Sequence, residues 1–579
     1  MEPIDTILDA LDRGTAANIL DGARNPALFE RHAAAVAACE ARARAALAEP
    51  IPPLPWSKFR LFKDTGNRSE YERPYFARRV RLADLVICLL AGRDADGALL
   101  HDLEDLLWAI CDECTWALPA HLWGNRPMPI ELDLFSTETS LYLSELLHLV
   151  GDRLDPRVVA RCRDEIKRRI LDSFLADYPR CWWEQGTNNW GAVCADSIGI
   201  TFLYEESDPA RRRAAFARVL ATMDRFLDSF PSDGVCVEGG GYWNYGFGHF
   251  VVLADFILQY TNGAVDLFDD PRAHRIARFP QCAALSQTRF VSFADGSRFR
   301  SQTNAVIERL AARYADVTPR SGVLSGNPTH KLDLLVRAFL WCDPERKTPP
   351  HLPDQTTFFD AAQWLVVRHA PFAFAALFGN NGVPHNHNDV GSFLMVDGDG
   401  EGPMDLGSGE YTRQYFSAER YTILCNGAQG HSVPIVGGEL QKAGREYKAS
   451  DVTFEEKADE TVFSGDIAGA YGLDALASLR RTFRIRPAKK AVTVSDAFAF
   501  NGAPLSVTER FVGYAGAEVT GPGTARFGAF DVRFDPALKA AVHTEPMSPH
   551  GTGTSTVHIL DIEVPAGTFT FDIVFSSRV

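Results

Sequence analysis

The chain has 579 residues, too many for one ordinary hydrophobic core, so we expect at least two domains. Its 46% hydrophobic and 23% charged residues are typical of a globular protein and exclude a largely disordered chain. The net charge of −16 argues against a nucleic-acid partner, which would need a broad basic face. An acidic sugar is not excluded, because a locally basic or amide-lined cleft can lie on an acidic protein.

The sequence carries no visible targeting or membrane signal. Its first residues, Met1 to Asp5, lack the basic and apolar regions of a signal peptide, and no apolar stretch reaches the roughly 18 residues that span a bilayer. Eleven cysteines, an odd number, suit reduced thiols better than a disulfide framework, and the Cys111–Cys114 pair has no second pair at zinc-ribbon spacing. We expect a cytoplasmic protein without a membrane partner, or a periplasmic or secreted one if a leader has been removed.

Amphipathic helices are predicted along the first 350 residues. Apolar residues recur at spacings of three and four between Phe216 and Phe230, which marks one stripe on a helix. Similar stripes occupy 141–150, 158–174, 250–260 and 332–341. Since no strand pattern lies between them, residues 1–350 are predicted to form a domain of helices packed on helices.

After residue 350 the pattern changes to alternation with a period of two. Phe569, Phe571, Ile573 and Phe575 alternate with more polar positions, which predicts a strand with one buried face. Further strands are predicted at 364–368, 372–378, 482–486, 492–500 and 557–564. Glycine-rich turns separate them, so residues 351–579 are predicted to form an antiparallel β-sandwich, and the chain to be an α+β multidomain protein.

The strongest local signal for chemistry is a polar run with two histidines two residues apart, His385 and His387. Side chains at this spacing on an extended segment project to the same side. Asp405 and His431 follow downstream, and two histidines with one carboxylate are a common zinc-binding set. A set of hydrogen-bonded loop histidines is the alternative that the spacing leaves open.

Two other motifs precede helical patterns. Asn188 and Asn189 form a tandem that either caps a helix or presents amides to a ligand. The run EGGGYWNYG at 238–246 combines glycines, which let a backbone approach a ligand closely, with aromatic rings that suit a sugar. A packed turn with buried rings is the alternative that would explain the same residues.

Together these motifs resemble the heparinase II/III-like polysaccharide lyases. The runs NNWGAVC at 188–194, EGGGYWNYG at 238–246 and HNHNDVGSF at 385–393 occur in that family's order. DLFSTET at 133–139 and the segment from Asp405 to His431, with FSAERY at 416–421, are also similar. The resemblance covers about residues 130 to 435 and implies an incomplete (α/α) toroid followed by an antiparallel β-sandwich.

The resemblance also implies roles for individual residues. By the match to heparinase II, His385 is catalytic, while His387, Asp405 and His431 hold a structural zinc ion. Asn189 is the candidate that neutralises the carboxylate of a uronate, and a tyrosine transfers the proton. Of the two tyrosines in the glycine-rich motif, Tyr245 is preferred over Tyr242 because the family's tyrosine lies close before the next helix. The candidate substrate-binding residues are Asn188, Trp190, Trp243, His249 and Glu238.

The chain departs from part of the family at two positions. Trp190 stands where several relatives carry a histidine after the asparagine pair, and Trp243 stands where several have histidine after tyrosine. Mechanisms that need a second histidine base are therefore in doubt.

The implied activity is β-elimination on a uronate-containing acidic polysaccharide or oligosaccharide of the glycosaminoglycan or alginate type, giving an unsaturated product. A glycoside hydrolase on the same toroid is one alternative, and it would need two opposed carboxylates, for which Glu238, Asp295 and Asp389 are available. A non-catalytic polysaccharide-binding protein is another. The choice of polymer, endo or exo action and the oligomeric state, including a homodimer, stay open.

Overall fold

The chain divides into two compact units in the computed structural model, which describes residues 3–123, 126–176, 178–551 and 553–578. Unit 1 comprises Met1–Ser229, Asn244–Ala277 and Thr303–Thr348, and unit 2 comprises Phe230–Trp243, Arg278–Gln302 and Pro349–Val579. The domains predicted at 1–350 and 351–579 are contiguous, whereas these units are not, and their outermost residues (1, 2 and 579) lie outside the described part.

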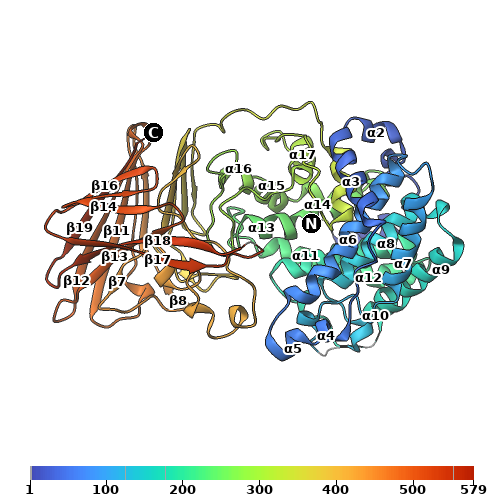
Figure 1. Ribbon diagram of the computed structural model, residues 1–579, viewed down its shortest axis with the longest axis horizontal. Helices are drawn as coiled ribbons and strands as arrows, with labels where there is room; N and C mark the ends of the chain where they lie inside the picture. Colours follow the sequence, from blue (N-terminus) through green and yellow to red (C-terminus); the bar gives the residue numbers. More distant parts are fainter. Residues whose placement is uncertain (1–2, 124–125, 177, 552, 579) are drawn as a thin grey trace. The chain divides into compact units, whose positions relative to one another are not determined.

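Unit 1 is built of helices, as the apolar spacing predicts (Figure 1). Its α-helices are α1 Ile4–Leu11, α2 Pro26–Glu30, α3 Ala33–Ala46, α4 Trp56–Phe59, α5 Leu61–Thr65, α6 Ser69–Leu90, α7 Ala98–Cys111, α8 Leu134–Val150, α9 Pro156–Ile166, α10 Asp172–Leu175, α11 Asn189–Glu205, α12 Pro209–Asp228, α14 Gly248–Tyr260, α15 Pro271–Ala277, α17 Asn304–Arg313 and α18 Leu332–Trp341. Helix α11 packs against α8, α12 and α14, and nearly all of its side chains are buried. It is therefore a central helix of the unit.

Side-chain caps set the starts of the two helices that carry the asparagine and DLFSTET motifs. At α8 the Asp133 carboxylate accepts a hydrogen bond from the Ser136 amide (2.7 Å), and the Asp133 amide donates to the Ser136 hydroxyl (2.9 Å). At α11 the Asn188 side chain accepts from the Trp190 amide at 3.2 Å. The cap of α11 is thus Asn188, which leaves the side chain of Asn189 available for another role.

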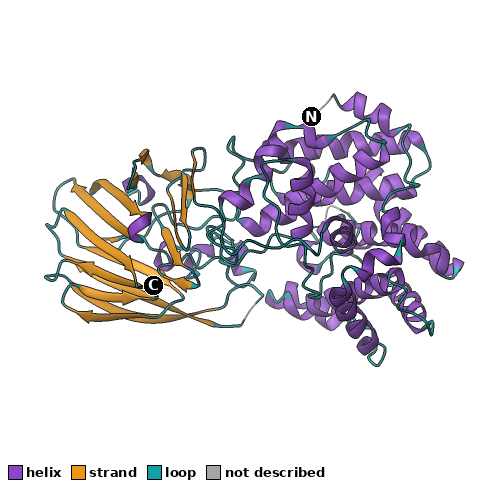
Figure 2. Cartoon of the chain, turned by 90° about the horizontal axis from the view of Figure 1, so that it is seen from above, coloured by secondary structure: helices purple, strands orange, loops and turns teal. Residues whose placement is uncertain are grey.

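Unit 2 contains the strands, which Figure 2 draws in orange. They are β1 Gln355–Phe359, β2 Trp364–His369, β3 Phe372–Leu377, β4 Asn380–Asn381, β5 Phe393–Asp397, β6 Gly400–Glu401, β7 Ile435–Val436, β8 Gly444–Lys448, β9 Ser450–Glu456, β10 Thr461–Asp466, β11 Leu476–Arg486, β12 Ala491–Phe500, β13 Val507–Gly513, β14 Ala517–Gly521, β15 Thr524–Phe527, β16 Phe530–Phe534, β17 Lys539–Met547, β18 Ser555–Val564 and β19 Thr570–Ser577. Two short helices, α13 Gly240–Tyr242 and α16 Phe279–Cys282, also belong to this unit.

The strands pair antiparallel in every sheet. The largest sheet has the order β14-β15-β16-β19-β12-β11-β10-β9, the next β1-β2-β3-β5-β6 and the third β17-β18-β13-β7. Phenylalanines from different sheets, such as Phe374, Phe483 and Phe511, share one buried core. Sheets that bury a common apolar face in this way form a sandwich, so this part of the prediction is confirmed.

One predicted buried position is wrong. Phe571, Ile573 and Phe575 are buried on β19, but Phe569 is 53% exposed. The strand begins only at Thr570, and the carbonyl of Phe569 accepts a hydrogen bond from the Phe498 amide while its ring stays outside the core. Alternation in the sequence does not show where a strand begins.

Two segments from the first 350 residues join unit 2 through close backbone packing and charge. Gly239 has φ +106°, and a Cβ there would lie 2.8 Å from the Cα of Gly296, so the 230–243 and 278–302 segments can only meet at a glycine. Arg289 pairs with Glu401 at 3.1 Å, which ties the second segment to the strand region. These contacts bring Glu238 and Asp295 to the histidine run. Among the described residues no helix is long and apolar enough to cross a membrane.

Candidate functional site

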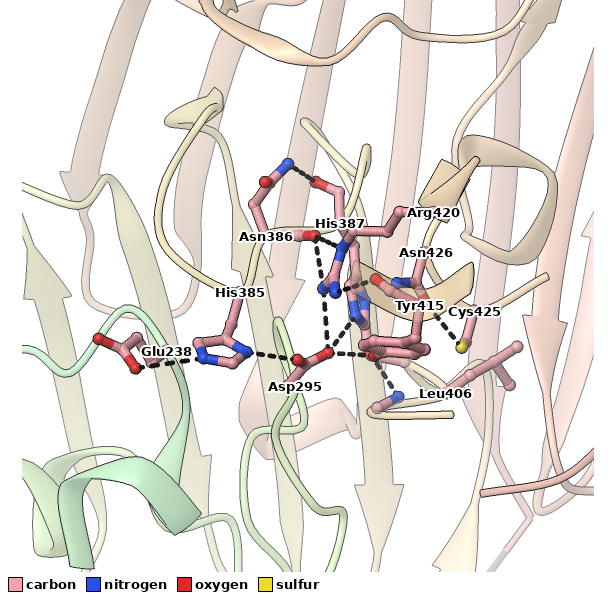
Figure 3. A network of polar contacts seen from close by, with 12 residues as sticks. Glu238, Asp295, His385, Asn386, His387, Leu406, Tyr415, Arg420, Cys425 and Asn426 are labelled. Carbon is pink, nitrogen blue, oxygen red and sulfur yellow. Dashed lines mark hydrogen bonds and ion pairs between the residues drawn. The ribbon is translucent and has the colours of Figure 1, made fainter. Parts of the chain in front are cut away.

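The centre of the site in unit 2 is the carboxylate of Asp295, whose side chain is fully buried (Figure 3). It accepts hydrogen bonds from His385 Nδ1 (2.7 Å) and His387 Nε2 (3.1 Å). The Tyr411 hydroxyl (3.1 Å), the Tyr415 hydroxyl and Arg420 Nη2 (3.2 Å) also donate to it. Burial alone would raise the pKa of this carboxyl, but the hydrogen bonds from the two histidines hold the pKa well below its usual value. Asp295 is therefore an ionised acceptor that fixes its neighbours.

One ring nitrogen of His385, Nδ1, forms a hydrogen bond, while Nε2 is available to a ligand. Because Nδ1 donates to Asp295, the neutral ring keeps the lone pair of Nε2, which lies 3.8 Å from Glu238 Oε2, beyond hydrogen-bond distance. The side chain is 22% exposed, so a ligand can reach it. The backbone of His385 has φ +56°, a left-handed conformation that costs a non-glycine residue roughly 1 kcal/mol or more. Such strain is typical of a functional residue held in place by its surroundings.

Tyr242 lies directly against His385. The two rings are stacked with centroids 4.2 Å apart and an interplanar angle of 29°. The Tyr242 hydroxyl is 2.6 Å from that of Tyr411, and since Tyr411 donates its proton to Asp295, Tyr242 is the donor in the pair. Burial and the negative charge of Asp295 raise the pKa of the Tyr242 phenol well above its usual value. The phenol is consequently protonated at neutral pH, so it carries the proton that a general acid would transfer.

Glu238 completes this side of the site. Its Oε2 atom is buried and has no hydrogen-bond partner among the described residues. Burial raises the pKa of the carboxyl above its usual value, with His385 opposing the shift. A buried oxygen without a partner next to the open nitrogen of His385 is available to a ligand.

A second cluster in unit 2 has the chemistry of a metal site. The ligand atoms of His387, Asp389, Asp405 and His431 all lie within 4.8 Å of one another, and the four residues are buried. His431 Nδ1 is 3.1 Å from Asp405 Oδ2, and His387 Nδ1 has no hydrogen-bond partner among the described residues. Two imidazole nitrogens with two carboxylates are a zinc-type donor set. The predicted ligands His387, Asp405 and His431 are thus brought together, with Asp389 as a fourth.

The Nε2 atoms of His387 and His431 both form hydrogen bonds to acceptors. His387 Nε2 bonds Asp295, and His431 Nε2 donates to the carbonyl of Cys425 at 2.9 Å. With Nε2 donating, Nδ1 of each neutral ring keeps its lone pair, and hydrogen-bond partners of metal-binding histidines commonly fix the ring in this way. Burial raises the pKa of Asp389 to about 7, and a cation in the pocket would offset this cost of burying the carboxylate. The residues therefore fit a zinc ion.

The remaining predicted residues lie in unit 1, around the start of α11. Asn189 is 5% exposed, and its amide has no hydrogen-bond partner in the described part of the chain. Trp190 belongs to a group of rings: it stacks on Trp123 (5.3 Å, 26°) and meets Trp182 at 5.0 Å. Trp123 is 52% exposed, so this group offers aromatic surface beside Asn189.

In unit 1 His249 is buried, and Tyr245 is partly buried with its hydroxyl enclosed. His249 Nδ1 is 2.6 Å from Asp196 and Nε2 is 3.3 Å from Glu138; burial lowers the pKa of the ring, but the two carboxylates outweigh it and raise the pKa to about 9. The Tyr245 ring lies under Lys331 Nζ at 4.1 Å. Burial and the charge of Glu138 raise the pKa of the Tyr245 phenol well above its usual value. Both residues belong to a buried charge network.

The structure therefore separates the predicted residues into three sets. Unit 2 brings together Glu238, Tyr242, His385, His387, Asp405 and His431. Unit 1 holds Asn188, Asn189, Trp190, Tyr245 and His249. Trp243 is fully buried and offers no face to a substrate.

The sequence does not reveal the central role of Asp295 or the contacts of Tyr411, Tyr415 and Arg420 with it. From the sequence, Asp295 and Asp389 are only carboxylates available to a hydrolase. For Asp389 a signal existed, because it lies two residues after His387 in the same polar run. For Asp295 no signal existed, since 90 residues separate it from His385.

Comparisons with known proteins support this fold. No protein-family model and no curated protein sequence matches the chain. Among solved structures, heparinase III is similar with a TM-score of 0.63 and 13% identity over 93% of this chain and 84% of its own. A Streptomyces coelicolor chondroitin AC lyase in complex with chondroitin sulphate has a TM-score of 0.56 and 14% identity, over 97% and 83%. A Paenibacillus xanthan lyase has a TM-score of 0.58 and 12% identity, over 97% and 60%. The chain therefore has the fold of these polysaccharide lyases, a helical toroid followed by antiparallel β-sheets.

Proposed function

We propose that the protein is a polysaccharide lyase that cleaves a uronate-containing acidic polysaccharide by β-elimination. The observation that carries the proposal is the arrangement around Asp295: a histidine with a fixed tautomer and an open nitrogen, stacked on a protonated tyrosine. A base and an acid side by side are the groups that an elimination requires. The names of the structural neighbours support a polysaccharide as the substrate class.

The proposed reaction uses His385 and Tyr242 in separate roles. His385 Nε2 removes the proton from C5, next to the uronate carboxylate, and the electron pair forms the C4–C5 double bond. The C4–O4 bond breaks, and Tyr242 donates its proton to the departing O4. The Asp295 carboxylate stabilises the imidazolium that forms at His385. Proton return from His385 to solvent and reprotonation of Tyr242 complete the cycle.

The sequence left two alternatives, a glycoside hydrolase and a non-catalytic binding protein. The geometry of the site favours neither. A hydrolase would need two opposed carboxylates with free oxygens. Of the three candidates, Asp295 is bound by five donors and Asp389 belongs to the zinc-type cluster, which leaves Glu238 alone. A non-catalytic binding protein would have no need of a strained histidine held by an ionised carboxylate.

The test of the function is a product assay on a panel of heparan, chondroitin, hyaluronan, alginate and xanthan. A lyase produces an unsaturated uronate, which absorbs in the ultraviolet and gives a fragment lighter by one water than a hydrolysis product. New reducing ends without this absorbance would show a hydrolase. Binding to a polymer without any new chain end would show a binding protein.

We further propose that Asn189 neutralises the uronate carboxylate in unit 1, since its buried amide is not used for capping. Asn189→Ala should lower kcat by on the order of 100- to 1000-fold, the usual effect of losing a donor aimed at developing charge. Asn189→Asp should be worse, because it places a like charge beside the substrate. Steady-state kinetics measure both effects.

The control for this prediction is Asn188→Asp, which preserves the oxygen that caps α11, so its melting temperature should match that of the wild type. Circular dichroism must show that Asn189→Asp is folded. A folded Asn189→Asp variant with wild-type turnover would remove Asn189 from the mechanism.

We also propose that His387, Asp389, Asp405 and His431 hold a structural zinc ion that stabilises the loop carrying His385. Elemental analysis should find about one zinc per chain. His387→Ala should lose the metal and melt at a lower temperature, since the binding energy of a structural site is folding energy, on the order of several kcal/mol.

The matched control is His369→Ala, which removes a half-exposed histidine of the same unit whose ring pairs, among the described residues, with Asp354 alone. This variant should keep both the metal and the melting temperature. Wild-type protein without metal, and with a melting temperature unaffected by chelators, would show that the four residues are an ordinary polar cluster.

A further inference from the structure

A cavity of about 540 Å³ in unit 1 is lined by none of the residues assigned to the proposed reaction or to the zinc-type cluster. Trp56 and Phe59 of α4, Tyr71 from the first turn of α6 and the residues that follow the end of α7 line it. This volume is within the roughly 300–1,000 Å³ of pockets that bind small molecules or single sugar units.

The cavity has an aromatic wall with one exposed face. Trp56 is 67% exposed and stacks on Phe59 (5.5 Å, 21°), which in turn meets Tyr71 edge to face (5.3 Å, 88°). Phe59 and Tyr71 thus support the indole from one side and leave its surface to solvent. A supported, exposed indole suits the flat apolar face of a sugar ring.

The charges in the wall disfavour an anionic ligand. The guanidinium of Arg78 already donates to Glu113 (3.0 Å), to the Pro52 carbonyl (2.8 Å) and to the Ala109 carbonyl (3.1 Å). Asp112 and Glu113 follow the C-terminal end of α7, where the helix dipole adds partial negative charge. Among the described lining residues two carboxylates, Asp112 and Glu113, outnumber the one guanidinium, so a sulfate or carboxylate would meet net negative charge, whereas an uncharged sugar would meet no repulsion.

The cavity is at the same end of unit 1 as Asn189. The ring of His121 connects the starts of three helices: it contacts Arg68 before α6 (3.3 Å), Asp133 before α8 (2.8 Å) and Trp190 in α11 (ring centroids 4.8 Å). Tyr71 belongs to the first turn of α6. A polymer held at Asn189 therefore has the cavity at the same helix ends.

We propose that this cavity binds an uncharged sugar unit, with Trp56 as the face on which the sugar stacks. The link to the substrate rests on the proposed lyase function: the bound unit would belong to the polysaccharide whose uronate is cleaved. The preferred polymers would then contain neutral sugars as well as uronates.

Cys114 provides a direct test, because it lines the cavity and is the one exposed cysteine of the eleven, all of which are described. The rate of its alkylation by N-ethylmaleimide is measured on the full chain with cellobiose, lactose, mannobiose or diacetylchitobiose, and with glucuronate. At least one of the uncharged disaccharides should slow labelling, and glucuronate should not. Trp56→Ala should weaken this protection by roughly fivefold, the effect of losing one aromatic contact.

The matched control is Trp108→Ala, which removes another exposed tryptophan, on α7, that does not line the cavity, and it should keep full protection. No protection by any of the disaccharides, equal protection by glucuronate, or loss of protection in Trp108→Ala would each overturn the proposal. The measurement needs no turnover, so a chain that cleaves no uronate polymer but is protected by a disaccharide would keep the cavity proposal and lose the lyase proposal.

Discussion

Tyr242→Phe should lower kcat by roughly 100- to 10,000-fold and leave substrate affinity nearly unchanged, because it removes a proton donor and keeps the ring. The phenylalanine ring can still stack on His385, whose centroid is 4.2 Å away, so the site should keep its shape. Binding to a substrate polymer, measured by calorimetry, and turnover, measured by absorbance of the product, separate the two effects.

Tyr245→Phe is the control for this result, and it tests the tyrosine that the sequence favours. The Tyr245 hydroxyl is buried in unit 1 beside Glu138, so its removal changes a buried network and leaves the His385 pair intact. Activity should stay within a few-fold of wild type. Loss of turnover in Tyr245→Phe together with an active Tyr242→Phe variant would reverse the assignment and restore the preference drawn from the family resemblance.

Asp295→Asn is expected to be at least as damaging as removal of His385. The amide is nearly isosteric with the carboxylate, but it can donate a hydrogen bond to His385 Nδ1 and so favour the tautomer whose Nε2 carries the proton. A base in the wrong tautomer typically costs on the order of 10,000-fold in turnover. His385→Ala removes the base itself and should cost roughly 100- to 10,000-fold.

The decisive measurement is the turnover of the double variant that combines Asp295→Asn with His385→Ala. If Asp295 acts through His385, the variant with both changes should be no slower than the slower single variant, because residues that work as one unit are not additive. Zinc content and melting temperature are measured in parallel, since Asp295 also contacts His387 and Arg420. If the losses of turnover in the two single variants multiply in the double variant while the zinc content is unchanged, Asp295 has a separate role. Wild-type turnover in Asp295→Asn would remove Asp295 from the mechanism.

The sequence by itself determined the two kinds of architecture and three members of the buried cluster, His387, Asp405 and His431. Apolar spacing along 332–341 coincides with α18, and alternation along 492–500 falls within β12, because burial of one face imposes these periods on any helix or strand. His385 and His387 were found because neighbouring residues on an extended segment share a side. These are local properties, and a local pattern is enough to predict them.

Only the tertiary structure decided which groups act on one another. Asp295 lies beside the segment of Glu238 because Gly239 and Gly296 let two distant segments touch, and its hydrogen bond to His385 joins residues 90 positions apart. No periodicity in the sequence records such contacts. The sequence likewise could not decide between Tyr242 and Tyr245 as the proton donor. The two are three residues apart and look alike in the sequence, yet one stacks on His385 while the other lies under Lys331 in the other unit. The roles of acid and base depend on burial and neighbouring charge, and both are set by segments that are remote in the chain.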